Sequence, residues 1–187
     1  MSTGHDDTPH PGRRLVVRGI DHVGLTVPDL EEATAFLVTA LGAEMLYDTL
    51  PREQGPRGDA DTDERLGVPY GTRQRAIRML ALPTGPGIEL FEFTGPRQRD
   101  AAIPSDIGWQ HVAVYCDDLD AAAQRVVEAG GELLSEPRPL PGPEAGERNR
   151  FVYTRTPWGS TLELLTWPDP QPYEQETART RHRPARP

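Results

Sequence analysis

The chain has 187 residues, with 29 acidic side chains against 20 basic ones and a formal net charge of −9. This acidic balance argues against nucleic acid or a membrane surface as the main partner, because both attract clustered positive charge. All of the basic residues are arginine, so mechanisms that need a lysine, such as Schiff-base chemistry or a P-loop phosphate site, are excluded.

The sequence also indicates a cellular location. It has no apolar run of the roughly 18–20 residues that cross a bilayer, and residues 1–14, predicted to be a flexible tail, have no signal-peptide core. The single cysteine, Cys116, has no partner for an internal disulfide. A reducing, cytoplasmic location is therefore expected, with Cys116 as an inert thiol on the helix-facing side of its strand.

The first predicted element is an apolar strand over residues 19–27. A helix follows, with Asp29 as its N-cap and Gly42 at the place of a left-handed C-cap, because apolar residues between them recur at helical spacing. The stretch 50–71 is rich in Pro, Gly, Asp and Arg, which predicts a long surface loop, with a lid over a pocket as the alternative. Three further strands are predicted at 43–47, 77–82 and 88–93.

The same order of elements returns later in the chain. A strand is predicted over 108–116, followed by a helix with Asp118 as its N-cap and Gly131 at its left-handed end. Shorter strands are predicted at 132–134, 150–156 and 161–167.

The two halves are copies of one module. Residues 19–23 (GIDHV) match 108–112 (GWQHV) at an offset of 89 residues, and 83–90 (PTGPGIEL) match 157–164 (PWGSTLEL) at an offset of 74. The smaller second offset means that the loop of the first copy is longer. The sequence therefore predicts an α+β fold of two tandem βαβββ modules. Their ranges are 15–97 and 106–168, followed by a Pro- and Arg-rich C-terminal tail at 169–187.

Four polar residues occupy equivalent positions in the two copies, one His and one Glu in each: His22 and Glu89, then His111 and Glu163. Alternation along a strand puts them on the sheet face opposite the helices, whereas Glu92, the rival to Glu89, falls on the other face. A pseudo-two-fold axis between the copies would allow all four to converge. Two imidazoles with carboxylates are a ligand set for Zn, Fe(II), Mn, Ni or Co, so a single divalent metal ion is predicted.

The tandem modules, with a His on the first strand and the Pro-x-Gly-x-x-apolar-Glu-Leu motif on the last, resemble the vicinal-oxygen-chelate superfamily over about residues 15–168. This superfamily includes glyoxalase I, methylmalonyl-CoA epimerase, extradiol dioxygenases and bleomycin-binding proteins. The resemblance implies half-open mixed sheets around a pocket, with His22, Glu89, His111 and Glu163 at the metal-ligand positions. It also implies a homodimer, in which the pocket lies within one chain or is shared between two.

The resemblance leaves three functions open. The first is an isomerase or lyase of the glyoxalase or epimerase type, which stabilises an enediolate of a small carbonyl substrate chelated through adjacent oxygens, with Glu163 or Glu89 as the catalytic base. The second is an Fe(II) ring-cleaving dioxygenase, in which His22, His111 and Glu163 form the ligand triad. The third is a metal-free small-molecule binding or resistance protein, although such proteins lack the ligands present here. Arg150 and Arg155 lie at the surface or hold a substrate carboxylate.

Overall fold

The structure is a computed structural model that describes residues 16–186, so the predicted tail at 1–14 lies outside the described residues. The first module contains β1 (His22–Val27), α1 (Leu30–Leu41), β2 (Glu44–Leu50), η1 (Arg52–Gln54), α2 (Ala60–Leu66), β3 (Arg73–Ala81) and β4 (Gly87–Thr94). The second contains β5 (Val112–Tyr115), α3 (Leu119–Glu128), β6 (Glu132–Leu133), β7 (Arg138–Pro139), η2 (Gly142–Glu144), β8 (Arg150–Arg155) and β9 (Thr161–Thr166). A short 3-10 helix, η3 (Pro172–Gln175), follows; η1 and η2 are also 3-10 helices. None of the described helices has the length and apolar character of a membrane span.

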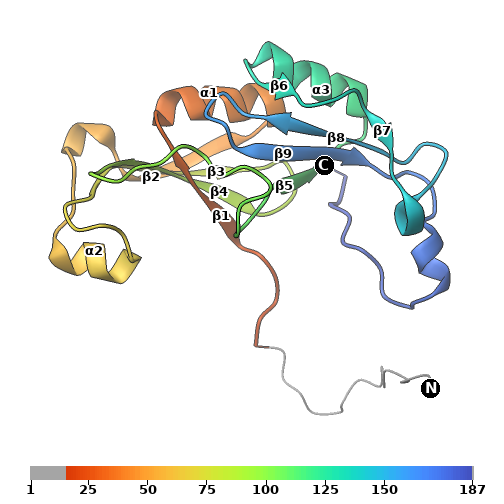
Figure 1. The fold of residues 1–187 in the computed structure, drawn as a ribbon, viewed down its shortest axis with the longest axis horizontal. Coiled ribbons are helices and arrows are strands. Elements are labelled where there is room, and N and C mark those ends of the chain that lie inside the picture. Colours follow the sequence, from red (N-terminus) through yellow and green to blue (C-terminus); the bar gives the residue numbers. More distant parts are fainter. Residues whose placement is uncertain (1–15, 187) are drawn as a thin grey trace.

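Each module folds into one mixed sheet with a helix on one face (Figure 1). The first sheet has the order β1-β4-β3-β2 and the second has the order β5-β9-β8-β6, with β7 also pairing with β8. In both sheets the first and last strands of the module run parallel, as β1 does with β4 and β5 with β9. The shared strand order confirms the α+β fold of two tandem βαβββ modules.

The predicted helix ends are correct in the first module and shifted by one residue in the second. Asp29 accepts hydrogen bonds from two backbone N–H groups of the first turn of α1, and Gly42 ends the helix in the left-handed region at φ 67°. After α3, however, the left-handed residue is Gly130 at φ 93°, not Gly131. Gly131 is needed for close packing instead, because a Cβ there would lie 2.7 Å from Val126 Cγ1.

The stretch 50–71, predicted to be a loop, contains the helix α2. Asp59 caps its start by accepting a hydrogen bond from the Thr62 backbone N–H at 2.8 Å, and Gly67 ends it at φ 65°. Asp63 is buried on this helix and accepts a hydrogen bond from the Gly71 N–H at 2.7 Å. The capping residues allow a short helix within a segment whose composition is typical of loops. Figure 1 shows α2 at the end of the molecule away from the second module.

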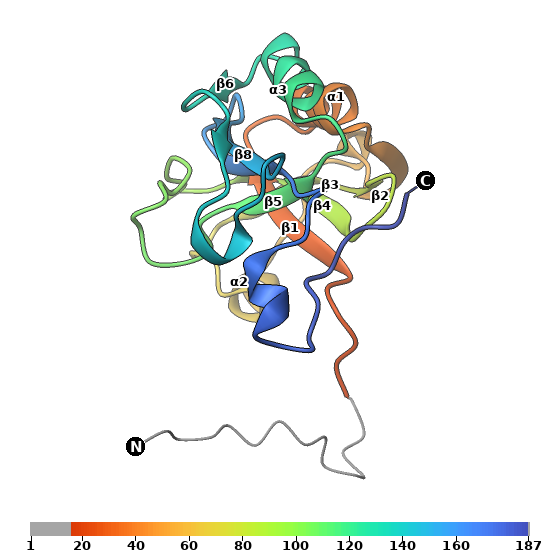
Figure 2. The same cartoon turned by 90° about the vertical axis from the view of Figure 1, so that its right-hand side faces the viewer.

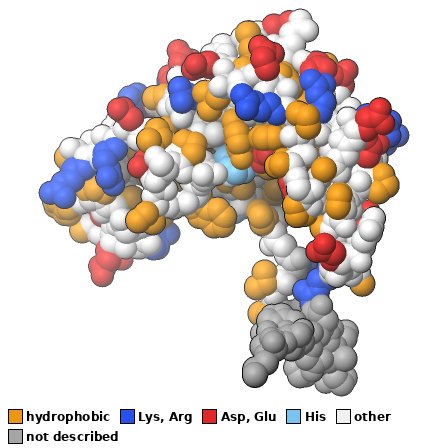
Figure 3. Space-filling model, turned by 45° about the vertical axis from the view of Figure 1, so that its right-hand side comes forward, with side chains coloured by type: hydrophobic (Ala, Val, Ile, Leu, Met, Phe, Trp, Pro, Cys, Tyr) orange, Lys and Arg blue, Asp and Glu red, His pale blue; other side chains and the backbone are white. Residues whose placement is uncertain are grey.

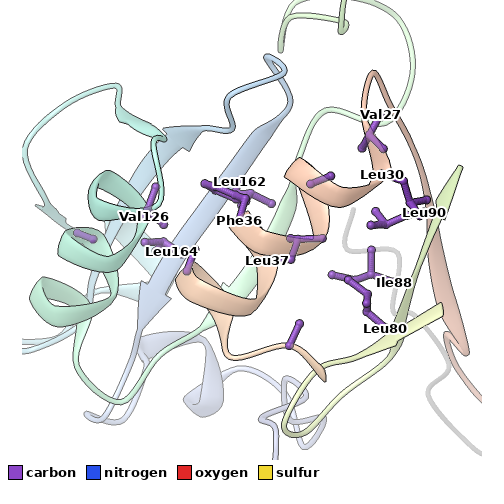
Figure 4. Close-up of a cluster of buried hydrophobic side chains, with 14 of the residues drawn as sticks. Val27, Leu30, Phe36, Leu37, Leu80, Ile88, Leu90, Val126, Leu162 and Leu164 are labelled. Carbon is purple, nitrogen blue, oxygen red and sulfur yellow. The ribbon is translucent and has the colours of Figure 1, made fainter. Parts of the chain in front are cut away.

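One hydrophobic core holds the two modules together. Helices α1 and α3 lie side by side on the same side of the two sheets (Figures 1 and 2), and buried side chains from both modules form one continuous cluster. Figure 4 shows Phe36 of α1 beside Leu162 of β9. The Phe36 ring also meets the edge of the Trp158 ring, with 5.3 Å between centroids. The modules are therefore joined through their helices, and the opposite face of the second sheet carries a smaller buried cluster that includes Leu165 and Trp167.

Truncation of Phe36 tests this shared core. Phe36 is 2% exposed and contacts the second module, so Phe36→Ala is expected to lower the free energy of unfolding by about 3–5 kcal/mol through the cavity that it leaves. Val38→Ala on the same helix is the control, because Val38 is 44% exposed. Urea unfolding followed by circular dichroism measures both. A normal second module beside an unfolded first module, seen as two separate transitions, would contradict the single core.

Candidate functional site

The open sheet faces carry the four residues that the sequence analysis selected. On β1 the side chains alternate as predicted, with His22 exposed and Val27 buried toward the helices. The parallel pairing of β1 with β4 places Glu89 opposite Gly24, one pleat along from His22. The pairing of β5 with β9 places Glu163 in the same relation to His111, which directly precedes β5. Each module thus presents one imidazole and one carboxylate on its open face.

The first pair is close enough to act together. His22 Nε2 lies 3.3 Å from Glu89 Oε2, and on the other side of the ring His22 Nδ1 lies 2.8 Å from Asp21 Oδ1. The hydrogen bond with Asp21 raises the pKa of His22. With Nδ1–H donated to Asp21, the Nε2 lone pair is directed toward Glu89 and is available to a cation.

The second pair repeats this arrangement with an amide in place of the acid. His111 Nε2 lies 3.1 Å from Glu163 Oε2, and His111 Nδ1 lies 2.9 Å from Gln110 Oε1. Partial burial raises the pKa of the Glu163 carboxyl, opposed by the positive charges of His111 and Arg181. The electrostatic field of Arg181, which comes from the C-terminal segment, therefore reaches this pair.

Each pair has the chemistry of half a metal site. A neutral imidazole beside a carboxylate, with the far ring nitrogen held by an acceptor, is the usual arrangement of protein ligands around a divalent ion. Within one chain, however, the described residues contain no group of three or more His, Cys, Asp or Glu side chains able to hold one ion. The contact between the modules is made mainly by α1 and α3.

Glu92 is placed on the opposite face from Glu89, as the strand alternation predicts. It is 3% exposed and accepts a hydrogen bond from the Leu30 backbone N–H at 3.0 Å, at the first turn of α1. Arg52 also pairs with its carboxylate. Glu92 therefore holds the start of α1 and the inserted segment, and Glu89 is the carboxylate of the open face.

Sequence reasoning missed Tyr153 as a residue of the open face. It pairs in register with Glu163, and its ring centroid is 5.3 Å from that of His111. Burial raises the pKa of the Tyr153 phenol. The offset of 74 residues between the copies was a usable signal, because it aligns Tyr153 with Met79 and so shows that the two halves differ beside their ligands.

The arginines considered from the sequence lie elsewhere. Arg150 forms an ion pair with Asp120 at 2.9 Å, and Arg155 forms one with Glu132 at 3.4 Å. Both pairs are on partly exposed or exposed side chains, which fits their surface alternative. Figure 3 shows a histidine within a hollow on one face of the molecule, surrounded mainly by hydrophobic side chains rather than basic ones.

Comparison with known proteins assigns the chain and its fold to a family. The family model described as the glyoxalase/bleomycin resistance protein/dioxygenase superfamily matches residues 19–164, and the chain belongs to this superfamily. A relative from Actinomyces sp., 2-epi-5-epi-valiolone epimerase, is 40% identical over 162 residues, which are 84% of each chain. An uncharacterised protein from Bacillus subtilis is 29% identical over 153 residues, covering 80% of this chain and 98% of the relative.

Solved structures confirm the fold at lower identity. A glyoxalase family protein from Bacillus cereus superposes with a TM-score of 0.62 at 20% identity, covering 84% of this chain and 98% of that one. Glyoxalase I from Zea mays gives a TM-score of 0.55 at 17% identity, covering 78% of this chain and 44% of that longer one. These likenesses show the shared architecture. The similarity to an epimerase supports an enzyme.

Cys116 packs against the core, and burial raises the pKa of its thiol to about 11. With that pKa only about 0.1% of the thiol is ionised at pH 8, and the thiolate is the reactive form. We expect the native protein to react with a disulfide reagent at pH 8 at least about 100-fold more slowly than the urea-unfolded chain. The release of the coloured thiol product measures both rates. Equal rates in the two states would show that the thiol is accessible.

Proposed function

We propose that the protein is a divalent-metal-dependent epimerase that acts on a small α-hydroxy ketone of the 2-epi-5-epi-valiolone kind. The observation that carries this proposal is the pair of equivalent His–Glu sites on the open faces, in a chain 40% identical to an epimerase of that substrate. A ketone with a hydroxyl on the neighbouring carbon offers the two adjacent oxygens that such a metal site chelates, and the carbon that bears the hydroxyl also carries the proton that epimerisation exchanges.

The residues that would hold the ion are His22 and Glu89 of one module and His111 and Glu163 of another. Their donor set fits Zn, Fe, Ni, Mn or Co, because it combines imidazole nitrogens with carboxylate oxygens. When bound, the ion supplies positive charge to the oxygens of the substrate and so makes the neighbouring C–H bond more acidic. Asp21 holds the His22 ring in place by a hydrogen bond, and Gln110 does the same for the His111 ring.

The two carboxylates would move the proton. Glu163 takes it from the carbon beside the carbonyl while the electron pair of the C–H bond moves to the carbonyl oxygen. Glu89, reaching the opposite side of the substrate, returns a proton to the same carbon as the electron pair moves back, which inverts the configuration. Exchange with water then restores both groups. Burial, which raises the pKa of Glu163, makes that carboxylate a stronger base than an exposed one.

A second copy of the chain would complete the site. Strands β1 and β5, next to the two histidines, are edge strands that pair only with β4 and β9 among the described strands. Apolar residues just before these strands are fully exposed, including Ile107 and Trp109. An isologous homodimer would cover this surface and bring the first pair of one chain to the second pair of its partner, so that one interface builds two equivalent sites.

The position of Glu89 weighs against the dioxygenase alternative. A ring-cleaving Fe(II) site uses two histidines and one carboxylate and keeps other positions open for oxygen. Here Glu89 lies 3.3 Å from His22 Nε2 and is only partly exposed, so each imidazole has its own carboxylate. Four ligands also favour a metal enzyme over a metal-free binding protein. Between the glyoxalase and epimerase types, the 40% identical relative favours the epimerase.

Proton exchange is the direct test. In D₂O the metal-loaded protein is expected to convert 2-epi-5-epi-valiolone to its C2 epimer and to place deuterium at that carbon. Glu163→Gln removes the proposed base and is expected to lower kcat by at least about 100-fold. NMR follows both the new epimer and the lost C–H signal.

Glu132→Gln is the matched control for that test, because Glu132 is exposed on the same module and pairs only with Arg155 among the described residues. Metal content per chain, measured by elemental analysis after purification without chelator, shows whether each variant still binds an ion. Full exchange by Glu163→Gln, or full activity in metal-stripped protein, would contradict the proposal.

Mixing of inactive variants tests the shared site. His22→Ala and His111→Ala are each expected to be inactive alone. Co-expression should restore about a quarter of the wild-type activity, because half of the dimers are mixed and each mixed dimer has one intact site. His22→Ala with Glu89→Gln is the control pair, since no combination of these two chains contains an intact first pair. No recovery in the first mixture would place the whole site within one chain.

A further inference from the structure

The C-terminal segment after β9 turns back onto the open face of the second module (Figure 1). Its path is fixed at several points. Gln171 is buried, the Arg181 backbone N–H donates to Tyr173 Oη at 2.8 Å, and the Arg181 guanidinium pairs with Glu144 at 2.5 Å. We call residues 176–186 the C-terminal strap. It lies outside the part of the chain that the family model matches, residues 19–164.

Arg183 of the strap lies against two aromatic rings of this face. Its guanidinium carbon is 3.9 Å from the centroid of the Trp167 ring and 5.3 Å from that of Tyr115, and it donates to the Trp167 carbonyl oxygen. Trp167 follows β9 at the same parity as Glu163, and Tyr115 shares the parity of His111. Arg183 is therefore on the face that carries the second His–Glu pair.

The guanidinium of Arg183 has donors to spare. An arginine side chain has five N–H groups, and Arg183 uses one of its terminal nitrogens to donate to the Trp167 carbonyl oxygen. No carboxylate among residues 16–186 forms an ion pair with Arg183, and the side chain is exposed. Next to it is an open cavity of about 370 Å³, lined by Trp167, Asp169, Tyr173, Glu174, Arg181 and Arg183 among others, and separate from the His–Glu pair.

Among the described residues, the first module has no counterpart of this arrangement. By the repeat offsets, Trp167 corresponds to Phe93 and Tyr115 to Thr26. Phe93 instead stacks on Phe91, with 5.6 Å between the ring centroids. The ligand pairs are thus nearly symmetric, whereas the strap adds positive charge and hydrogen-bond donors on one side only.

We propose that the strap forms one wall of the metal pocket and that Arg183 is a specificity-determining residue, which donates hydrogen bonds to acceptor oxygens of the substrate on the side away from the reacting carbon. This inference rests on the proposed function for the position of the metal. The acceptor oxygens belong either to ring hydroxyls of a neutral ketone or to a phosphate, and both fit a guanidinium. One-sided donors would admit the substrate in one orientation, as stereospecific proton transfer requires.

Binding of two probes to the metal-loaded protein tests the inference. Calorimetric titration uses 2-epi-5-epi-valiolone and inorganic phosphate with the wild type, Arg183→Gln and the control Arg186→Gln, which changes an exposed arginine of the same strap. Arg183→Gln is expected to weaken one probe at least about 10-fold, the size of a lost charged hydrogen bond, while Arg186→Gln and the metal content stay unchanged. Weaker ketone binding assigns the oxygens to hydroxyls, and weaker phosphate binding assigns them to a phosphate.

Two further measurements separate the possible failures. In the epimerase assay Arg183→Gln should raise KM with little change in kcat, because it touches no reacting atom. A chain that ends at Gln175 should show greater acrylamide quenching of tryptophan fluorescence, because Trp167 is only 7% exposed beneath the strap. If the wild type binds phosphate through Arg183 yet epimerises nothing, the proposed function fails and this inference stands. If Arg183→Gln alters the binding of neither probe, Arg183 is only a structural contact and the inference is overturned.

Discussion

The packing of α1 against α3 is the constraint on which the rest of the structure depends. Each helix covers one face of its own sheet, and the two helices bury a common core whose members include Phe36 and Leu162. Because this contact uses the helix side of both modules, the other sheet faces are not buried between the modules, and β1 and β5 are edge strands among the described residues. The polar residues on those faces are therefore available for chemistry, and each module supplies one imidazole and one carboxylate.

The repeat preserved the His–Glu pairs and changed their surroundings. His22 and Glu89 correspond to His111 and Glu163, with ring-to-carboxylate distances of 3.3 and 3.1 Å. Beside them, Met79 is replaced by Tyr153, and only the second module is covered by the C-terminal strap. Chelation of two oxygens tolerates near-symmetry, whereas a stereochemical outcome needs two distinguishable sides. The two modules differ at the residues beside the His–Glu pairs, where the two sides of a substrate would be distinguished.

Much of this arrangement could be predicted from the sequence, because a repeat reports both the elements and their faces. Strand parity alone separated Glu89 from Glu92, and the structure places Glu92 under the first turn of α1. Local signals failed where the alternatives have similar energies: the position of Gly130, one residue from Gly131, and the helix α2 within a loop-like composition. The separation of the two pairs and the path of the strap depend on contacts between distant residues, such as Arg183 with Tyr115, which no local pattern encodes.

The residue before each histidine differs in charge, and this makes the two halves unequal donors. The hydrogen-bond partner of the His22 ring is the carboxylate of Asp21, whereas the partner of the His111 ring is the neutral amide of Gln110. A charged acceptor makes an imidazole more electron-rich and a better ligand. In the proposed site a cation would therefore be bound more strongly by His22, next to Asp21, than by His111, next to Gln110. Glu163 belongs to the module of His111, where a carboxylate can exchange its bond to the ion for a proton at little cost.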